Sequence, residues 1–503
     1  MGIKMEQLRT LLGEVYDLQA INLILGWDQQ VNMPPGGAEA RSHHLATVNR
    51  ISHQKFISDE MGAALQAAKG ELETAGAEPD SNDMRIVIRM QEVYEKLRKV
   101  PSEWVAEFAR MTSLAQRNWE DAREGSDFAM FQPHLEQVIK FRRQYADFFA
   151  PYDHVYDPLL DYFEPGMKTA QVKAVFDELR PQQVALVRRI ADSGVQIDDS
   201  ILHKRYDEQK QWDFGVEVIK AFGFDFERGR QDKSVHPFTT HFSQNDVRIT
   251  TRINPNFLNP ALFGTMHEAG HAMYEQGIGE GIARTPVGQG ASLGIHESQS
   301  RMWENLIGRG YPFWKAYYSR LQSFFPEILS DTSLDDFYRA INKVEPTLIR
   351  VEADEATYNL HIMLRVELEL ALIEGTLAVG DLPEAWNRKM EEYLGIRPSN
   401  DAEGVLQDVH WASGYLGYFS TYLLGNLMAS MLWEKMEQDI PNMDALVEQA
   451  QFGDLLAWLR ENIHQHGAKY KPAELIRRVT GKSLTAEPYV RYLTNKFSDI
   501  YSL

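Results

Sequence analysis

The stretch SNDMRIVIRMQEVYEKLRK, residues 81–99, shows the pattern that decides the fold class. Several of its apolar side chains recur at a spacing of roughly three to four residues, which is that of one face of an α-helix. They are Met84, Ile88, Val93, Tyr94 and Leu97. The same spacing returns over residues 172–179, 184–190, 212–222, 360–373 and 416–436. The sequence therefore predicts a mostly helical chain, in which Pro181 divides one helix into two.

Two polar breaks interrupt this pattern, at residues 69–83 and 190–200. Both are short, and neither has the composition of a flexible linker between domains. The sequence also contains no internal repeat and no low-complexity tract. We therefore expect a single domain over residues 1–503, whose helices can form two lobes flanking a groove.

Composition excludes several functions. The chain has 503 residues, of which 44% are hydrophobic and 25% charged, and its formal net charge is −20. These values are typical of a globular protein, and the negative charge makes nucleic acid and anionic membranes poor partners. The sequence has no cysteine, which excludes disulfides, thiolate ligands and a cysteine nucleophile.

The N-terminal segment is typical of a helix and not of a signal peptide, and no apolar run is long enough to span a membrane, so we expect a cytoplasmic protein.

Residues 236–256, HPFTTHFSQNDVRITTRINPN, break the helical pattern. Apolar residues are mixed there with threonines, and turn-forming residues lie in the middle. We expect a small antiparallel β-sheet whose turn is formed by residues 243–246. Such a hairpin either braces the neighbouring helices or offers an edge strand to an extended peptide.

The motif HEAGH follows at once and begins at His267. Side chains four residues apart share one face of a helix, so His267 and His271 can bind one metal ion, and Glu268 can reach a water on that ion. The helix is predicted to run from an N-cap at Asn259 to an end at Gly277. Two core histidines that bond to their neighbours would give the same pattern.

A catalytic zinc needs a third protein ligand and an open position for water. Because cysteine is absent, the downstream candidates are His296 and Glu297, which follow a glycine-rich loop. We prefer Glu297, since two histidines and one glutamate form a common catalytic zinc set. Glu297, Arg301 and Glu304 share one face of the next predicted helix, so Glu304 can orient a ligand histidine. A solvated ion pair between Glu297 and Arg301 is the competing interpretation.

Six separated motifs, in this order, resemble those of the carboxypeptidase Taq family of zinc metallocarboxypeptidases. They are HPF at 236–238, DVRIT at 246–250, HEAGH at 267–271, HESQ at 296–299, IRVEAD at 349–354 and GVLQDVHW at 404–411. The resemblance extends over nearly the full length of the chain, and no departure removes a catalytic residue of the family.

The resemblance implies an elongated, mostly helical fold with a deep central groove, similar to neurolysin-like and angiotensin-converting-enzyme-like peptidases. It also implies a homodimer that releases single C-terminal amino acids from peptides with broad specificity. The implied cofactor is one Zn²⁺ per chain, for which Co²⁺ or Mn²⁺ can substitute. The implied partners are peptides with a free C-terminus, and neither nucleic acid nor a membrane.

A carboxypeptidase must bind a terminal carboxylate, and arginine suits this task because its fork pairs with both oxygens. The family's arginine is matched by Arg350. An i,i+4 ion pair between Arg350 and Asp354 on a helix is the alternative. His236 is a candidate substrate contact on the hairpin, whose other polar residues we assign to the fold.

His410 and Tyr418 resemble the histidine and tyrosine that stabilise the tetrahedral intermediate in angiotensin-converting-enzyme-like enzymes. Both side chains can donate a hydrogen bond to a developing oxyanion. For Tyr418, packing within an aromatic-rich helix is the alternative. Asp408 is a candidate to orient a histidine.

The expected reaction is attack of a metal-bound water on the scissile carbonyl, with Glu268 as the general base. An endo-oligopeptidase or a dipeptidyl carboxypeptidase would use the same centre and differ in the register of its products. A catalytically silent peptide-binding scaffold is a rival from another class. The presence of Glu268 argues against that rival, because binding a metal does not require this residue.

Overall fold

The computed structural model describes residues 2–503, so that Met1 of the predicted N-terminal helix lies outside the description. The chain folds into two compact units, each built from three separate segments. The first unit comprises Met1–Arg98, Asp198–Ile341 and Leu432–Thr480. The second comprises Lys99–Ile197, Asn342–Met431 and Gly481–Leu503.

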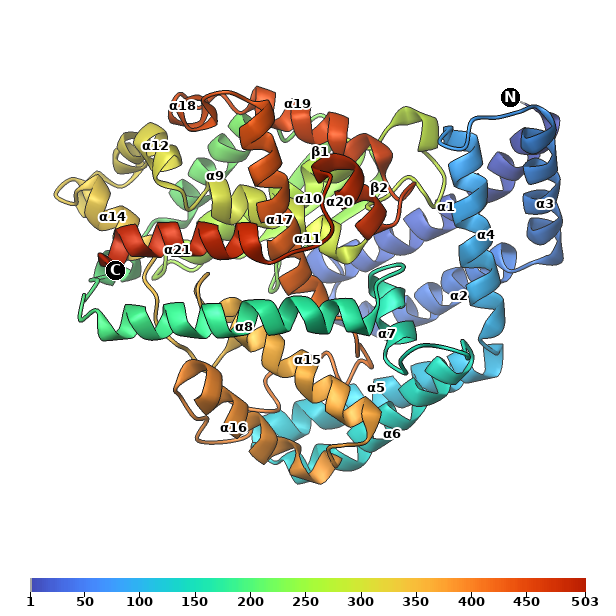
Figure 1. Cartoon of the computed structure of the whole chain (residues 1–503), viewed down its shortest axis with the longest axis horizontal. Coiled ribbons are helices and arrows are strands. Elements are labelled where there is room, and N and C mark those ends of the chain that lie inside the picture. Colours follow the sequence, from blue (N-terminus) through green and yellow to red (C-terminus); the bar gives the residue numbers. More distant parts are fainter. Residues whose placement is uncertain (1) are drawn as a thin grey trace. The chain divides into compact units, whose positions relative to one another are not determined.

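Helices dominate the first unit, as the periodicity predicts (Figure 1). Helix α1 packs against both α2 and α3. The helices are α1 (Ile3–Val31), α2 (Ala38–Phe56), α3 (Asp59–Thr74), α4 (Asn82–Lys99), α9 (Glu208–Phe222), α10 (Asn259–Gln276), α11 (Leu293–Arg301), α12 (Tyr311–Phe324), α13 (Pro326–Leu329), α14 (Leu334–Ile341), α18 (Met443–Glu448), α19 (Gly453–Asn462) and α20 (Pro472–Thr480). None of the helices in residues 2–503 is long and apolar enough to cross a membrane.

The second unit is also helical. Its helices are α5 (Ser102–Gly125), α6 (Phe128–Asp147), α7 (Asp157–Phe163), α8 (Thr169–Asp192), α15 (Tyr358–Glu374), α16 (Leu382–Leu394) and α21 (Glu487–Tyr501). The residues of α17 (Ser420–Asp439) are divided between the two units.

The predicted break at Pro181 is wrong, because α8 continues through this residue. A proline inside a helix costs about 3 kcal/mol, since one backbone hydrogen bond is lost and the ring crowds the preceding turn. Apolar side chains on both sides of it are buried, among them Phe176, Leu179, Leu186 and Val187. Burying each such side chain contributes roughly 1.5–3 kcal/mol, so their packing outweighs the cost of the proline.

A three-stranded sheet lies in the first unit, with strand order β1-β3-β2. Strands β2 (Thr239–Ser243) and β3 (Asp246–Thr251) form the predicted antiparallel hairpin, joined by a turn where the sequence places it. The sheet is nevertheless mixed and not purely antiparallel, because β1 (Gly229–Lys233) pairs with β3 in parallel. The sequence of β1, GRQDK, has no apolar alternation and therefore no strand signal.

Two helices are buried on nearly all sides, α10 in the first unit and α15 in the second. Helices of this kind form the core of large domains. Helix α10 contacts α9, α11, β2 and β3, and Figure 1 shows it beside the strands. It ends at Gly277 as predicted, but its N-cap is Leu258, so Asn259 is the first helical residue and not the cap. The motif at His267 therefore lies deep inside the unit.

Candidate metal centre

Helices α10 and α11 approach each other closely at Gly270. A Cβ atom at this position would lie 2.7 Å from the backbone oxygen of Gln299 and 2.7 Å from the Cα of Ser300. Only glycine allows this approach without displacing the backbone of α11. The contact brings Glu297 of α11 to the face of α10 that presents the two histidines of the motif.

The three predicted ligands lie together at this contact. The Nε2 atoms of His267 and His271 are each 3.6 Å from Oε2 of Glu297. One ligand atom of each residue lies within 4.8 Å of the others. Zinc bound tetrahedrally at about 2.0–2.1 Å holds its donor atoms roughly 3.3 Å apart, so the spacing fits a small divalent ion.

The second ring nitrogen of His267 faces a carboxylate. Its Nδ1 atom lies 2.8 Å from Oε2 of Glu304. Arg301 joins the two glutamates, because its Nε donates to Glu297 over 2.7 Å and its Nη1 to Glu304 over 3.2 Å. Glu304 lies in a π-helical turn, η4 (Met302–Ile307), that continues α11. The carboxylate thus has the position expected of a group that orients a ligand histidine.

The second ring nitrogen of His271 faces another imidazole. Its Nδ1 atom lies 2.7 Å from Nδ1 of His296. His296 is therefore placed behind His271 and not among the converging donor atoms. The Nε2 atom of His296 lies 2.7 Å from Oε1 of Glu275. Burial disfavours ionisation of Glu275, but His241 and His296 lower its pKa to about 2.

Glu268 lies beside the ligands and is buried. Burial raises the pKa of its carboxyl group. The hydroxyl of Thr239, in β2, donates a hydrogen bond to Oε2 of Glu268 over 2.6 Å. Sequence reasoning missed Thr239, although it expected the hairpin to lie beside this motif.

The two histidines differ in their protonation. Burial lowers the pKa of His267, but Glu297 and Glu304 outweigh it and raise the pKa to about 8. Burial lowers the pKa of His271 to about 3, and His296 and His267 add to this effect. Burial alone would raise the pKa of Glu297, but Arg301 and His267 hold it well below its usual range. Glu297 is therefore ionised near pH 7, which is the state that a metal ligand requires.

The candidate substrate arginine lies in the second unit. Arg350 is 6% exposed, and its Nε and Nη2 atoms donate to Oδ1 of Asp408 over 3.0 and 2.8 Å. Its Nη1 atom donates to the hydroxyl of Tyr358 over 3.2 Å. The alternative ion pair with Asp354 is wrong, because Arg350 begins a short 3₁₀ turn and Asp354 accepts from neighbouring backbone groups.

Asp408 also binds a second arginine. The Nε atom of Arg365 donates to Oδ2 of Asp408 over 2.7 Å. The side-chain oxygen of Gln407 accepts from the backbone of Arg350 and from Nη2 of Arg365. The Nδ1 atom of His410 lies 3.8 Å from Asp408, which is beyond hydrogen-bonding distance. Asp408 therefore anchors two arginines, and the structure does not show it orienting a histidine.

His410 and Tyr418 lie side by side in this unit, with ring centroids 5.2 Å apart. The Nε2 atom of His410 lies 3.3 Å from the hydroxyl of Tyr422, a residue that sequence reasoning missed. Burial lowers the pKa of His410 to about 4, so its ring is neutral near pH 7. His236 is an exposed residue between β1 and β2.

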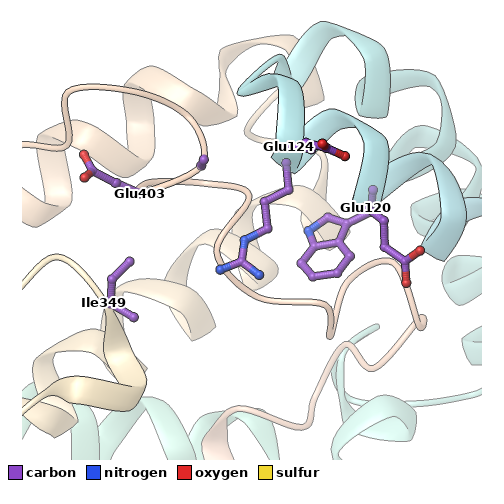
Figure 2. Close-up of a pocket in the computed structure, with 7 residues that line it drawn as sticks. Glu120, Glu124, Ile349 and Glu403 are labelled. Atoms are coloured by element: carbon purple, nitrogen blue, oxygen red, sulfur yellow. The ribbon is translucent and has the colours of Figure 1, made fainter. Parts of the chain in front are cut away.

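An open pocket of about 500 Å³ also lies in the second unit (Figure 2). Its lining residues are Trp119, Glu120, Arg123, Glu124, Ile349, Ala402 and Glu403. None of these seven is a predicted catalytic, metal-binding or substrate-binding residue.

A buried helix that presents two histidines and a glutamate, completed by a carboxylate from the next helix, defines the class of HExxH metallopeptidases. A family model described as "Carboxypeptidase Taq (M32) metallopeptidase" matches residues 7–497. The chain belongs to this family, as its motifs predict. It is therefore a metallocarboxypeptidase, a hydrolase that acts on peptide bonds.

Characterised relatives and solved structures agree with this assignment. The chain is 41% identical to Thermostable carboxypeptidase 1 of Thermus thermophilus over 493 residues, 96% of each protein. It is 40% identical to Carboxypeptidase 1 of Bacillus subtilis over 481 residues, 95% of each protein. The M32 carboxypeptidase of Deinococcus radiodurans R1 superposes with a TM-score of 0.97 at 38% identity over 100% of both chains. The mostly helical fold class is confirmed.

Proposed function

We propose that this protein is a zinc-dependent carboxypeptidase that releases single amino acids from the C-terminus of peptides with broad specificity. The observation that carries the proposal is the convergence of His267 Nε2, His271 Nε2 and Glu297 Oε2, with Glu268 beside them. The similarity to carboxypeptidases over nearly the whole chain supports the type of bond that is cleaved.

Two imidazoles and one carboxylate are a donor set that suits zinc, and cobalt or manganese can bind to the same set. His267, His271 and Glu297 would hold one such ion per chain. When bound, the ion polarises the scissile carbonyl and lowers the pKa of a water. Neutral imidazoles are required as ligands, so binding the ion displaces the proton that His267 otherwise holds.

Glu268 is the general base in this proposal. Its raised pKa makes the carboxylate a better proton acceptor than an exposed glutamate, and it lies next to the ligand His267 in the same helix. Glu268 takes the proton from the attacking water and passes it to the leaving amine. The hydrogen bond from Thr239 holds one of its oxygens, which leaves the other free to accept the proton.

The family motifs suggest roles for three residues of the second unit, Arg350, His410 and Tyr418. Arg350 holds the terminal carboxylate of the peptide, and Asp408 keeps its guanidinium in place. Neutral His410 and the hydroxyl of Tyr418 donate hydrogen bonds to the oxyanion. His236 is a substrate contact, and the enzyme is a homodimer.

A timed mass-spectrometric digest tests the function. An unmodified peptide and its C-terminally amidated twin are incubated with the enzyme, with and without a chelator. Stepwise loss of single C-terminal residues, abolished by amidation and by the chelator, is expected. Equal internal cleavage of both peptides would point to an endo-oligopeptidase, release of residues in pairs to a dipeptidyl carboxypeptidase, and no cleavage even with added zinc or cobalt to a silent scaffold.

The variant Glu268→Gln separates metal binding from chemistry. It is expected to bind zinc with the wild-type stoichiometry and to lose turnover by roughly a thousandfold or more, because the amide cannot act as the general base. Metal analysis and initial rates on the same preparation make the comparison. Wild-type turnover by this variant would contradict the role of Glu268.

A further inference from the structure

The two histidines of the motif are supported differently on the side that faces away from Glu297. His267 meets the Glu304 carboxylate directly. His271 instead meets the ring of His296, and the carboxylate of Glu275 follows only behind that ring. An imidazole thus stands between a candidate ligand and the carboxylate that supports it.

The hydrogen atoms of His271 and His296 can be placed so that both short contacts are hydrogen bonds. A ligand histidine that turns the lone pair of Nε2 toward an ion carries its hydrogen on Nδ1. The Nδ1 atom of His271 therefore donates to Nδ1 of His296. The hydrogen of His296 then lies on Nε2, which donates to Oε1 of Glu275. Both distances are 2.7 Å.

The short contact between the two rings is that of a hydrogen bond and not that of two donors to one metal ion. Two nitrogen donors of one zinc ion lie roughly 3.3 Å apart, as tetrahedral bonds of about 2.0–2.1 Å require. The nitrogens of His271 and His296 are closer than that and lie within hydrogen-bonding distance.

The carboxylate of Glu275 is buried and contacts two further groups. It is 2% exposed, and Oε1 also accepts from the backbone amide of Gly290 over 3.1 Å. Its Oε2 atom lies 3.6 Å from Nδ1 of His241 in strand β2. The carboxylate is thus fixed between the glycine-rich loop and the sheet.

The glycine-rich loop leaves room for the ring of His296. A Cβ atom at Gly290 would lie 2.5 Å from Cδ2 of His296 and 3.1 Å from the ring of Tyr274. The hydroxyl of Tyr274 accepts from the backbone amide of Ala291 over 3.0 Å, which fixes the loop next to this glycine. The loop therefore has the shape that the ring requires.

We propose that His296 and Glu275 are positioning residues that fix the orientation and tautomer of His271 and so set the affinity of the centre for its metal. The inference rests on the proposed function, in which His271 is a metal ligand. His296 does not bind the ion itself, although it is adjacent in sequence to the ligand Glu297.

Metal affinity of the full-length protein, stripped of metal and titrated with Zn²⁺ against a chromogenic chelator, tests the proposal. His296→Leu removes both hydrogen bonds and is expected to weaken Zn²⁺ binding about 10–100-fold. His296→Gln is expected to recover part of this loss, because its amide can accept from His271 and donate to Glu275. Glu275→Gln keeps the shape but removes the charge, and is expected to weaken binding about tenfold.

His464→Leu is the matched control. His464 is fully buried in the same unit, bonds to Gln299 and packs against Tyr274. Its loss therefore disturbs the packing near His296 but removes no hydrogen bond of His271, His296 or Glu275. It is expected to leave Zn²⁺ affinity unchanged. In the Co²⁺-loaded proteins, the visible absorption bands are expected to shift for His296→Leu and not for His464→Leu, since only the first removes the hydrogen bond that orients the ligand His271.

The outcomes separate this inference from the proposed function. A wild-type protein that does not bind Zn²⁺ overturns the metal centre itself. Wild-type binding that is retained in His296→Leu, or lost equally in His464→Leu, overturns the positioning role alone. Should His296→Leu not fold, wild-type affinity in Glu275→Gln also overturns it.

Discussion

The candidate metal centre and the cluster around Asp408 are both buried groups of charged side chains, and they are built differently. In the candidate metal centre, two histidines and Glu297 turn their ligand atoms toward one point. In the arginine cluster, Arg350 and Arg365 donate to the two oxygens of Asp408. The negative charge of Asp408 is therefore compensated within the cluster. The first arrangement favours binding of a cation from solution, whereas the second forms its ion pairs within the protein. We therefore expect substitutions in the first to change metal affinity, and in the second to change stability.

The largest effect is expected at Asp408. Asp408→Asn leaves two buried guanidinium groups poorly compensated, and breaking a buried pair in this way costs about 3–5 kcal/mol of the free energy of unfolding. Denaturant unfolding measures the loss, and a zinc titration is expected to show unchanged affinity. Asp246→Asn is the control, because its ion pair with Arg248 is partly exposed and is expected to cost at most about 1 kcal/mol. A loss no larger than that of the control would remove the distinction between the two clusters.

The next largest effect is the pH dependence of the free energy of unfolding, which we attribute in part to Glu369. This carboxylate accepts hydrogen bonds from Trp411 Nε1 over 2.8 Å and from the amide of Gly417 over 2.9 Å. Burial raises the pKa of this carboxyl group from 4.5 to about 7. The folded state thus binds the proton more tightly than the unfolded state does. The corresponding stability, up to roughly 3 kcal/mol, is fully present below about pH 4.5 and is lost as the pH rises through about 7.

Unfolding free energies at several values between pH 4.5 and 8 check this dependence. The variant Glu369→Gln cannot titrate and is expected to lose less stability over the interval than the wild type. Parallel curves for the two proteins would show that Glu369 does not contribute to the pH dependence.

Within the candidate metal centre, Glu304 contacts His267 directly, whereas Glu275 supports His271 only through His296. Glu304→Gln removes the carboxylate that supports His267 directly, and zinc affinity is expected to fall about 10–100-fold, or roughly 1.4–2.7 kcal/mol. Because Glu275 acts through an intervening ring, Glu275→Gln is expected to have the smaller effect. Competition titrations of the two variants in the same buffer test the order, and the reverse order would contradict direct support of His267 by Glu304.

The smallest effect is expected at Thr239. Thr239→Val keeps the β-branched shape and removes the hydrogen bond to Glu268, so kcat is expected to fall about tenfold, or about 1.4 kcal/mol, with unchanged metal content. Thr240→Val, on the opposite face of the same strand, is the matched control and is expected to leave kcat unchanged. Equal rates in the two variants would show that the hydrogen bond does not assist catalysis.

Much of the fold and of the metal centre follows from local sequence patterns. The apolar spacing of residues 81–99 predicts a helix, and α4 covers nearly the same residues. The four-residue spacing of His267 and His271 is enough to place both rings on one face of α10. Spacing and ligand chemistry together favoured Glu297 over His296, and the structure brings Glu297 to the two histidines.

The features that sequence reasoning missed depend on contacts between distant residues. Strand β1 is polar and exists because β3 pairs with it. Thr239 reaches Glu268, 29 residues away, and Asp408 reaches Arg350, 58 residues away. No spacing rule in a single sequence indicates such pairs. The row from His271 to Glu275 through His296 is hidden for the same reason.

In the proposed enzyme, His267, His271 and Glu297 bind one zinc ion. Anomalous diffraction from crystals of the zinc-loaded protein, measured on both sides of the zinc absorption edge, tests it directly. One strong anomalous peak per chain is expected, about 2 Å from Nε2 of each histidine and from a carboxylate oxygen of Glu297. A zinc peak bound instead by His296, or no peak between the three ligands, would contradict it.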